Sequence, residues 1–141
     1  MAGDALTVSA GLLAYVALTL LLVSILVGYR SVLVLQGRPA NTFTPSGEDV
    51  GPFSQRLCRA YLNCVENLPH AGALMLLSLV SDQAAVVAPL MGVFVGARWC
   101  QSLVHLASIH PAAVIVRFTF FVLQIGIEAY WLVMLVRSIF A

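Results

Sequence analysis

The sequence contains no lysine, and only 9% of its residues are charged. With a formal net charge of +1, it lacks the basic surface that binding of nucleic acid requires. The cysteines Cys58, Cys64 and Cys100 are odd in number and lack the paired spacing of a metal site. We therefore expect free thiols, with no nucleic-acid partner and no metal. A catalytic thiol remains an alternative.

Hydrophobic residues make up 61% of the chain, which is far too apolar for a soluble domain. We expect one all-α integral membrane domain over residues 1–141, in contact with membrane lipids. Four apolar stretches are each long enough to cross about 30 Å of hydrocarbon, and they predict an antiparallel four-helix bundle. The spans cover about residues 7–35, 53–80, 84–108 and 112–139, with Ser54 as a candidate cap and Pro69 as a kink in the second.

The placement of arginine predicts the orientation in the membrane. Four arginines flank the loop between the first two spans: Arg30, Arg38, Arg56 and Arg59. Arg98 and Arg117 approach the third loop on the same side, and Arg137 lies on the opposite side. By the positive-inside rule, the first and third loops are cytoplasmic and both termini are non-cytoplasmic. A bacterial inner membrane and an endoplasmic reticulum membrane both fit this multi-pass pattern.

A polar stripe runs along the second span. Its members follow at intervals of 3, 4, 3 and 4 residues: Arg56, Arg59, Asn63, Glu66 and His70. At 3.6 residues per turn, this spacing places them on one face of a helix. Such groups are costly in lipid unless they face protein or water, so we interpret the stripe as one wall of a polar ligand site. The alternative is a set of salt bridges and amide contacts that hold helices together.

A second polar stripe lies on the third span. Its members are spaced by 3, 4 and 3 residues: Arg98, Gln101, His105 and Ser108. Because the second and third spans are antiparallel, the two stripes are expected to converge. The fourth span adds Arg117, Gln124 and Glu128. Arginine suits carboxylates, thiolates and phosphates, so the pattern favours a small zwitterionic ligand with several carboxylates.

Two further polar residues are expected to be structural. His70, beside Pro69, is interpreted as packing between helices rather than binding a ligand. Glu128 is interpreted as a buried acid paired with an arginine, with a proton relay as the alternative. A small transporter or channel subunit would also use intramembrane charges, but the chain lacks the paired broken helices or repeats of transporters.

The segment from Arg59 to Pro69 reads Arg-Ala-Tyr-Leu-Asn-Cys-Val-Glu-Asn-Leu-Pro. It resembles the Arg-Ala-x-x-Asn-x-x-Glu-x-x-Pro segment of the MAPEG family, the membrane-associated proteins of eicosanoid and glutathione metabolism. The form here is similar to that of its leukotriene C synthase and microsomal glutathione transferase members and of short bacterial relatives. The resemblance implies a homotrimer with active sites between subunits. Glutathione would bind near the cytoplasmic side, and a lipophilic substrate would approach from the membrane.

The resemblance also implies roles for particular residues. Arg59, Asn63 and Glu66 match the motif positions that hold glutathione. Further expected glutathione-binding residues are Tyr61, Arg98, Gln101 and His105. Candidates for stabilising the glutathione thiolate are Arg117, Arg30 and Arg38, because adjacent positive charge lowers the pKa of a thiol.

The sequence departs from the family pattern in the fourth span. Relatives carry an arginine where this chain has Ala112, Ala113 and Val114, and Arg117 follows about one turn later. The tyrosine expected near His105 is also missing. The leading hypothesis is a glutathione-dependent transferase or peroxidase acting on lipophilic electrophiles or lipid hydroperoxides. The alternative, which the missing arginine favours, is a catalytically inactive MAPEG-like binding or scaffold protein.

Overall fold

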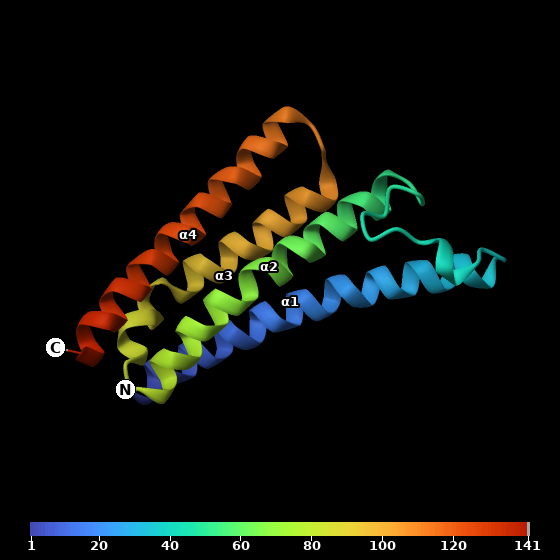
Figure 1. Ribbon diagram of the computed structural model, residues 1–141. Helices are drawn as coiled ribbons and strands as arrows, with labels where there is room; N and C mark the ends of the chain where they lie inside the picture. The colour runs from blue at the N-terminus through green and yellow to red at the C-terminus, as the bar shows by residue number, and fades with distance from the viewer. Residues whose placement is uncertain (141) are drawn as a thin grey trace.

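The computed structural model describes residues 1–140, which form four α-helices and one short 3₁₀ helix (Figure 1). Their bounds are α1 Ala2–Leu35, η1 Ala40–Thr42, α2 Pro52–Val80, α3 Ala84–Ala107 and α4 Pro111–Phe140. Both termini lie at the same end of the bundle in Figure 1, as four antiparallel helices require. The predicted all-α four-helix bundle is confirmed.

Two helix starts differ from the prediction. α1 begins at Ala2 rather than near Thr7, and the terminal amine lies 2.8 Å from the Asp4 carboxylate in its first turn. α2 begins at Pro52, and Gly51 is its N-cap residue without a side-chain capping bond. Ser54 is therefore buried inside the helix and is not its cap. Proline favours this early position because its fixed φ already suits a helix and its missing N–H is not needed there.

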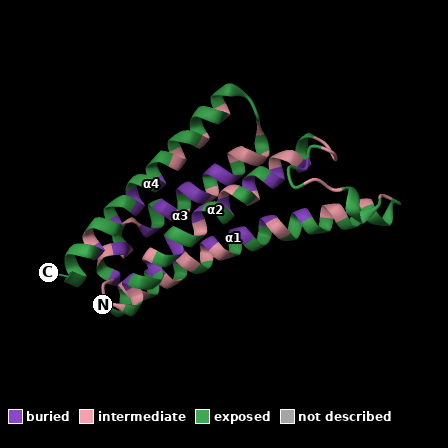
Figure 2. Ribbon diagram, viewed as in Figure 1, coloured by how far each residue is buried: buried purple, intermediate pink, exposed green. Residues whose placement is uncertain are grey.

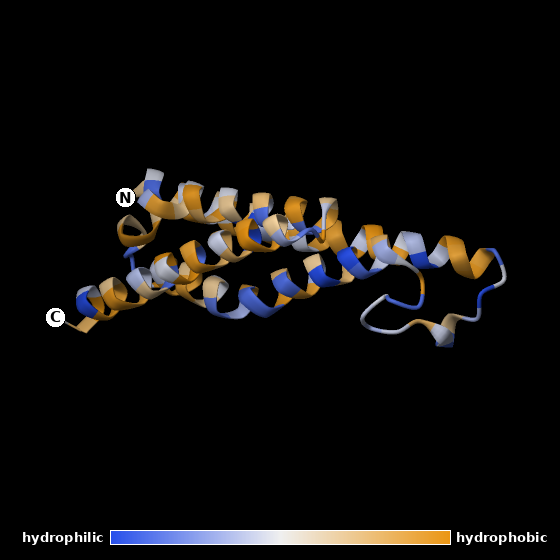
Figure 3. Cartoon of the chain, turned by 90° about the horizontal axis from the view of Figure 1, so that it is seen from above, coloured by the Kyte–Doolittle hydropathy of each residue, from blue (hydrophilic) through white to orange (hydrophobic). Residues whose placement is uncertain are grey.

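Three of the helices are long and apolar enough to cross a membrane: α1, α3 and α4. They fit an integral multi-pass membrane protein. α2 has 29 residues, or about 43 Å at 1.5 Å per residue, but it carries the whole of the first polar stripe. Figure 3 shows apolar residues in orange along most of the helical surface and hydrophilic residues in blue at the connection between α1 and α2.

The core is built around α3, which packs against each of the other three helices. Buried residues face inward from all four helices, as the purple segments of Figure 2 show. Tyr15 of α1, Phe94 of α3 and Trp131 of α4 form an aromatic row, with ring centroids 6.0 and 5.0 Å apart. Gly11 permits the close approach of α1 to α3, since a Cβ there would lie 2.2 Å from the Met91 sulfur.

α4 lies at the side of this core. It packs mainly on α3 and contacts α2 much less. In the view of Figure 1, α4 diverges from α3 toward the end where residues 108–110 connect the two helices. The polar residues of α2, α3 and α4 therefore meet beside a splayed pair of helices.

Candidate functional site

A cavity of about 260 Å³ opens between α2, α3 and α4. Its polar lining comes from three helices: Asn63 of α2, Gln101 and His105 of α3, and Arg117 of α4. Its apolar lining comes from α4 alone: Val114, Phe118 and Phe121. We call this set of seven residues the bundle cavity. Among the described residues that line it there is no carboxylate.

The two predicted polar stripes meet at the floor of the bundle cavity. Arg98 is fully buried, and its Nη1 donates to Asn63 Oδ1 over 2.6 Å and to Gln101 Oε1 over 3.1 Å. Gln124 Nε2 donates to the same Gln101 oxygen over 2.9 Å. The expected convergence of the stripes is confirmed. The contacts join three helices, as the helix-holding alternative proposed, and they leave a cavity above them.

Arg117 and His105 contact each other in the lining of the bundle cavity. Arg117 Nη1 lies 3.2 Å from His105 Nδ1 and 3.5 Å from the Ser108 carbonyl oxygen. A guanidinium can only donate hydrogen bonds. The His105 Nδ1 atom therefore accepts, and the imidazole is neutral with its proton on Nε2.

The two charged motif residues of α2 point away from the chain's own core. Arg59 and Glu66 are exposed, and neither forms an ion pair within residues 1–140. Tyr61 is half-buried and packs against the core. Arg56 donates to the carbonyl oxygen of Leu106 over 2.8 Å, which satisfies a carbonyl at the end of α3. Arg56 therefore ties α2 to α3 and does not line the bundle cavity.

Glu128 does not pair with an arginine, so that expectation is wrong. Its Oε2 lies 2.6 Å from His70 Nδ1, and the glutamate is 6% exposed. The pair joins α4 to α2, where the two helices otherwise contact little. The predicted helix-packing role of His70 is confirmed. Arg98 Nη1 is occupied by Asn63 and Gln101, while Arg98 Nε, Arg98 Nη2 and Glu128 Oε1 are buried without a hydrogen-bond partner within residues 1–140.

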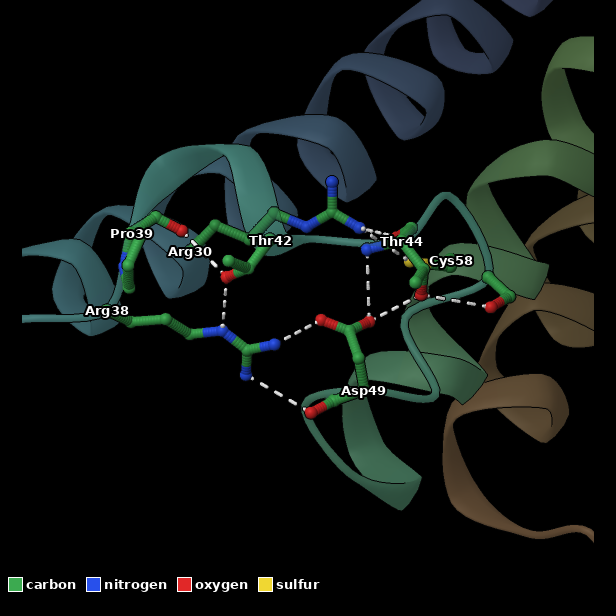
Figure 4. Close-up of polar contacts among 8 residues, drawn as sticks. Arg30, Arg38, Pro39, Thr42, Thr44, Asp49 and Cys58 are labelled. Atoms are coloured by element: carbon green, nitrogen blue, oxygen red, sulfur yellow. Dashed lines mark hydrogen bonds and ion pairs between the residues drawn. The ribbon is translucent and has the colours of Figure 1, made fainter.

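Arg30 and Arg38 hold the loop between α1 and α2 (Figure 4). Arg38 Nη2 pairs with the Asp49 carboxylate, and its Nη1 donates to the Asp49 carbonyl oxygen over 3.1 Å. Arg30 Nη2 donates to the Thr44 carbonyl oxygen over 2.7 Å and lies 3.6 Å from Cys58 Sγ. We call Arg30, Arg38, Thr44, Asp49 and Cys58 the loop clasp.

The loop clasp contains two guanidinium groups and one carboxylate, and the buried Arg30 Nε has no hydrogen-bond partner within residues 1–140. Phe43 lies between its two guanidinium groups, 5.3 Å from Arg30 and 4.7 Å from Arg38. Asp49 accepts from the Thr44 hydroxyl and the Thr44 backbone N–H. The hydroxyl bond, the backbone bonds and the Arg38 charge lower the pKa of the Asp49 carboxyl below its ordinary value.

A second, larger cavity of about 550 Å³ lies beside the loop clasp. Arg30 and Ser31 supply its polar lining. Its other lining residues are Val27, Val34, Leu35, Ala40 and Phe43. Within the chain this cavity is formed by α1 and the loop, so Arg30 and Arg38 do not reach the bundle cavity that holds Arg117.

The apolar wall of the bundle cavity was missed at the sequence level. Phe118 and Phe121 follow Arg117 by one and four residues. In a uniformly apolar helix, however, no periodicity distinguishes a cavity wall from a surface that faces lipid. The clasp role of Asp49 was also missed, because it depends on how the loop folds back.

A family model described as the MAPEG family matches residues 8–137 of the chain. No curated protein and no solved structure matches it. The matched region contains all seven residues of the bundle cavity and the whole loop clasp.

Proposed function

The chain belongs to the MAPEG family, and from that premise we propose that it is a glutathione-dependent transferase or peroxidase acting on lipophilic electrophiles or lipid hydroperoxides. Membership supports a membrane protein of glutathione and eicosanoid metabolism. The proposal that the protein activates a thiol rests on the residues that line the bundle cavity.

The observation that carries the proposal is the composition of the bundle cavity. A guanidinium, an imidazole and two amides face an apolar wall that contains two phenylalanines. Positive charge and hydrogen-bond donors favour a thiolate over a thiol, and the apolar wall suits a substrate dissolved in the bilayer. Polar residues that only held helices together would need no apolar cavity wall opposite them.

The two proposed reactions need no cofactor besides glutathione. Arg117 stabilises the glutathione thiolate, whose sulfur attacks an electrophilic carbon. Where the electrophile is an epoxide, the carbon–sulfur bond forms as the carbon–oxygen bond of the ring breaks, and the ring oxygen takes up the proton that the thiol released. With a hydroperoxide, two glutathione thiols are oxidised to the disulfide while the hydroperoxide is reduced to an alcohol and water.

We propose that exposed residues of α2 bind the charged groups of glutathione. Arg59 would pair with a glutathione carboxylate, and Glu66 would receive its ammonium group. Asn63 and Gln101 would donate to it from the cavity floor, with His105 beside them and Tyr61 at the edge. Arg30 and Arg38 are engaged in the loop clasp, so Arg117 is the proposed thiolate partner.

The exposed charges also support assembly into a homotrimer. Arg59 and Glu66 are exposed on a helix that runs beside three apolar, membrane-crossing helices. Facing lipid, such side chains cost several kcal/mol, at about 2.5 kcal/mol or more for a charge at the bilayer centre. A neighbouring copy that covers α2 removes this cost and places Arg59 and Glu66 in a site between subunits.

The second candidate is a binding or scaffold protein without turnover. The observation that favours it is the hydrogen bonding of Arg98, Asn63, Gln101 and Gln124 to one another, which is typical of interhelical polar contacts. It predicts glutathione binding without consumption of an electrophile.

The test is calorimetry of glutathione binding to the detergent-purified protein. Wild type should bind saturably, and Arg59→Ala and Glu66→Ala should each weaken binding by at least about tenfold. Arg137→Ala is the matched control, since Arg137 is exposed at the far end of α4. Absence of binding by a folded wild-type oligomer would contradict the proposal. Binding without turnover of any electrophile or hydroperoxide would favour the scaffold.

A further inference from the structure

We infer that Arg98 is a positioning residue that turns two amide groups so that the bundle cavity offers N–H donors to its ligand and therefore selects an anion. The inference rests on the proposed function for the identity of the natural anion. It rests on hydrogen-bond geometry and on the unpaired charges of Arg98 and Arg117 for the charge of the atom that binds. Arg98 itself is fully buried and needs no contact with the ligand.

The first step concerns Asn63. An arginine has only donors, so the Asn63 side-chain atom 2.6 Å from Arg98 Nη1 must be the amide oxygen. The Nδ2 group of Asn63 is thereby left free, and it makes no hydrogen bond within residues 1–140. Asn63 lines the bundle cavity, so the amide offers it two N–H bonds.

The same argument fixes Gln101 twice. Its Oε1 accepts from Arg98 Nη1 and from Gln124 Nε2. Gln124 Nε2 also donates to the Phe120 carbonyl oxygen over 2.8 Å, which identifies that atom as nitrogen independently. Gln101 therefore turns its Nε2 donors toward the remaining open direction, the cavity. Reversal of either amide would place nitrogen against the guanidinium.

The other two polar side chains of the bundle cavity, His105 and Arg117, also present N–H donors. His105 accepts through Nδ1 from Arg117, so its free nitrogen is a donor. Arg117 has donors only. No ion pair joins Arg98 to a carboxylate within the described chain, so its charge adds positive potential beneath the cavity. Every polar side chain of the bundle cavity thus presents hydrogen atoms, and the matching ligand atom is an acceptor with negative charge, such as a thiolate, carboxylate or sulfonate.

The test compares two probes with the same six-carbon chain and opposite charge, 1-hexanesulfonate and hexylammonium. Binding is followed by NMR on the side-chain amide signals of protein labelled with ¹⁵N-glutamine and ¹⁵N-asparagine in non-ionic detergent. Wild type should bind the sulfonate at least about tenfold more tightly than the ammonium. A ratio near one in wild type would overturn the inference.

Four variants address the role of Arg98. Gln101→Glu keeps an oxygen toward Arg98 but replaces the donor in the cavity with a carboxylate oxygen, so the preference should vanish or reverse. Gln36→Glu adds the same charge at the exposed end of α1 and should leave the ratio unchanged. Arg98→Met frees the Asn63 amide and leaves Gln101 held by Gln124 alone, so the ratio should fall toward one. Arg98→Lys again offers only donors and should restore most of it.

These outcomes separate the inference from the proposed function. If Gln101→Glu and Arg98→Met both keep the wild-type ratio, the positioning role is wrong even if glutathione binds. If Arg98→Met does not fold, Gln101→Glu and Arg98→Lys still decide the matter. If the charge preference follows the variants as expected but glutathione does not bind to wild type, the proposed function fails and the inference stands.

Discussion

The loop clasp and the bundle cavity both use arginine, but they surround it differently. In the loop clasp, Arg38 meets a carboxylate, a carbonyl oxygen and an aromatic face. In the bundle cavity, Arg117 faces an imidazole nitrogen and a distant carbonyl oxygen, with apolar side chains around it. The first arginine has its counter-ion within the chain. The second lacks one among the described residues.

The difference shows which arginines can serve a ligand. A guanidinium whose donors are already occupied stabilises the fold, and a guanidinium with free donors and no counter-ion can bind an anion from outside. Position along the bundle does not separate Arg38 from Arg117, because both lie near the same end. Their hydrogen-bond acceptors separate them.

The largest effect is expected at Arg117. Arg117→Met keeps the packing of the side chain and removes the charge, so thiol-transfer turnover should fall about 10²- to 10³-fold, as when a donor to a developing anion is lost. Steady-state assays with glutathione and a lipophilic electrophile measure it. Arg137→Met on the same helix is the control and should keep wild-type turnover. Equal losses in both variants would show that α4 needs charge in general rather than Arg117 in particular.

Much of this comparison was accessible from the sequence. The 3- and 4-residue spacing placed Asn63 on a polar face of α2, and the antiparallel order of the helices placed that face against Arg98 and Gln101. Both predictions depend only on helix geometry and connectivity, which the apolar pattern defines well. The four-helix bundle followed for the same reason.

Other features depend on distances that no spacing rule contains. Glu128 had several cations at similar depth as possible partners, and His70 is the one that the packing of α4 against α2 brings within 2.6 Å. The roles of Arg30 and Arg38 depend on a loop that returns to α1 through glycines with positive φ, Gly37, Gly47 and Gly51. Local sequence indicates that a loop is present but not which side chains it brings together.

The next effect concerns how α4 is held beside the bundle cavity. Glu128→Ala removes the acid that accepts from His70 and leaves a void in the core, so we expect a loss of about 3 kcal/mol in stability. Thermal unfolding in detergent measures the change. Ser138→Ala on the same helix removes only a bond to the Leu135 carbonyl oxygen within α4 and should cost less than about 0.5 kcal/mol. A negligible effect of Glu128→Ala would mean that α3 alone positions α4.

A smaller effect is expected at Gly47, in the loop that the loop clasp holds. Its φ is +70°, and a Cβ there would lie 2.7 Å from Ser54 Oγ and 2.8 Å from Cys58 Sγ. Gly47→Ala should therefore destabilise the loop by about 2 kcal/mol, from backbone strain and overlap together. Gly37→Ala is the matched control, since its φ is +99° but no atom lies within 4 Å, so strain alone applies. Limited proteolysis between residues 36 and 52 should speed up more for Gly47→Ala, and equal rates would remove the packing argument.

The smallest effect is a pH dependence confined to the loop clasp. Hydrogen bonding by Thr44 lowers the pKa of Asp49 below its ordinary value of 3.8 in the folded protein, so the carboxylate form stabilises the clasp. This stabilisation is complete above the pKa that Asp49 has in the unfolded chain, about 3.9, and it disappears as the pH falls through the lower, folded-state value. Asp49→Asn lacks it at every pH. The ratio of amide hydrogen-exchange rates in residues 42–50, variant over wild type, should therefore exceed one at pH 6 and approach one at pH 2. Glutathione binding at pH 7 should be the same in both proteins, because the bundle cavity contains no residue of the clasp. A ratio that stays constant with pH would show that Asp49 acts through its shape rather than its charge.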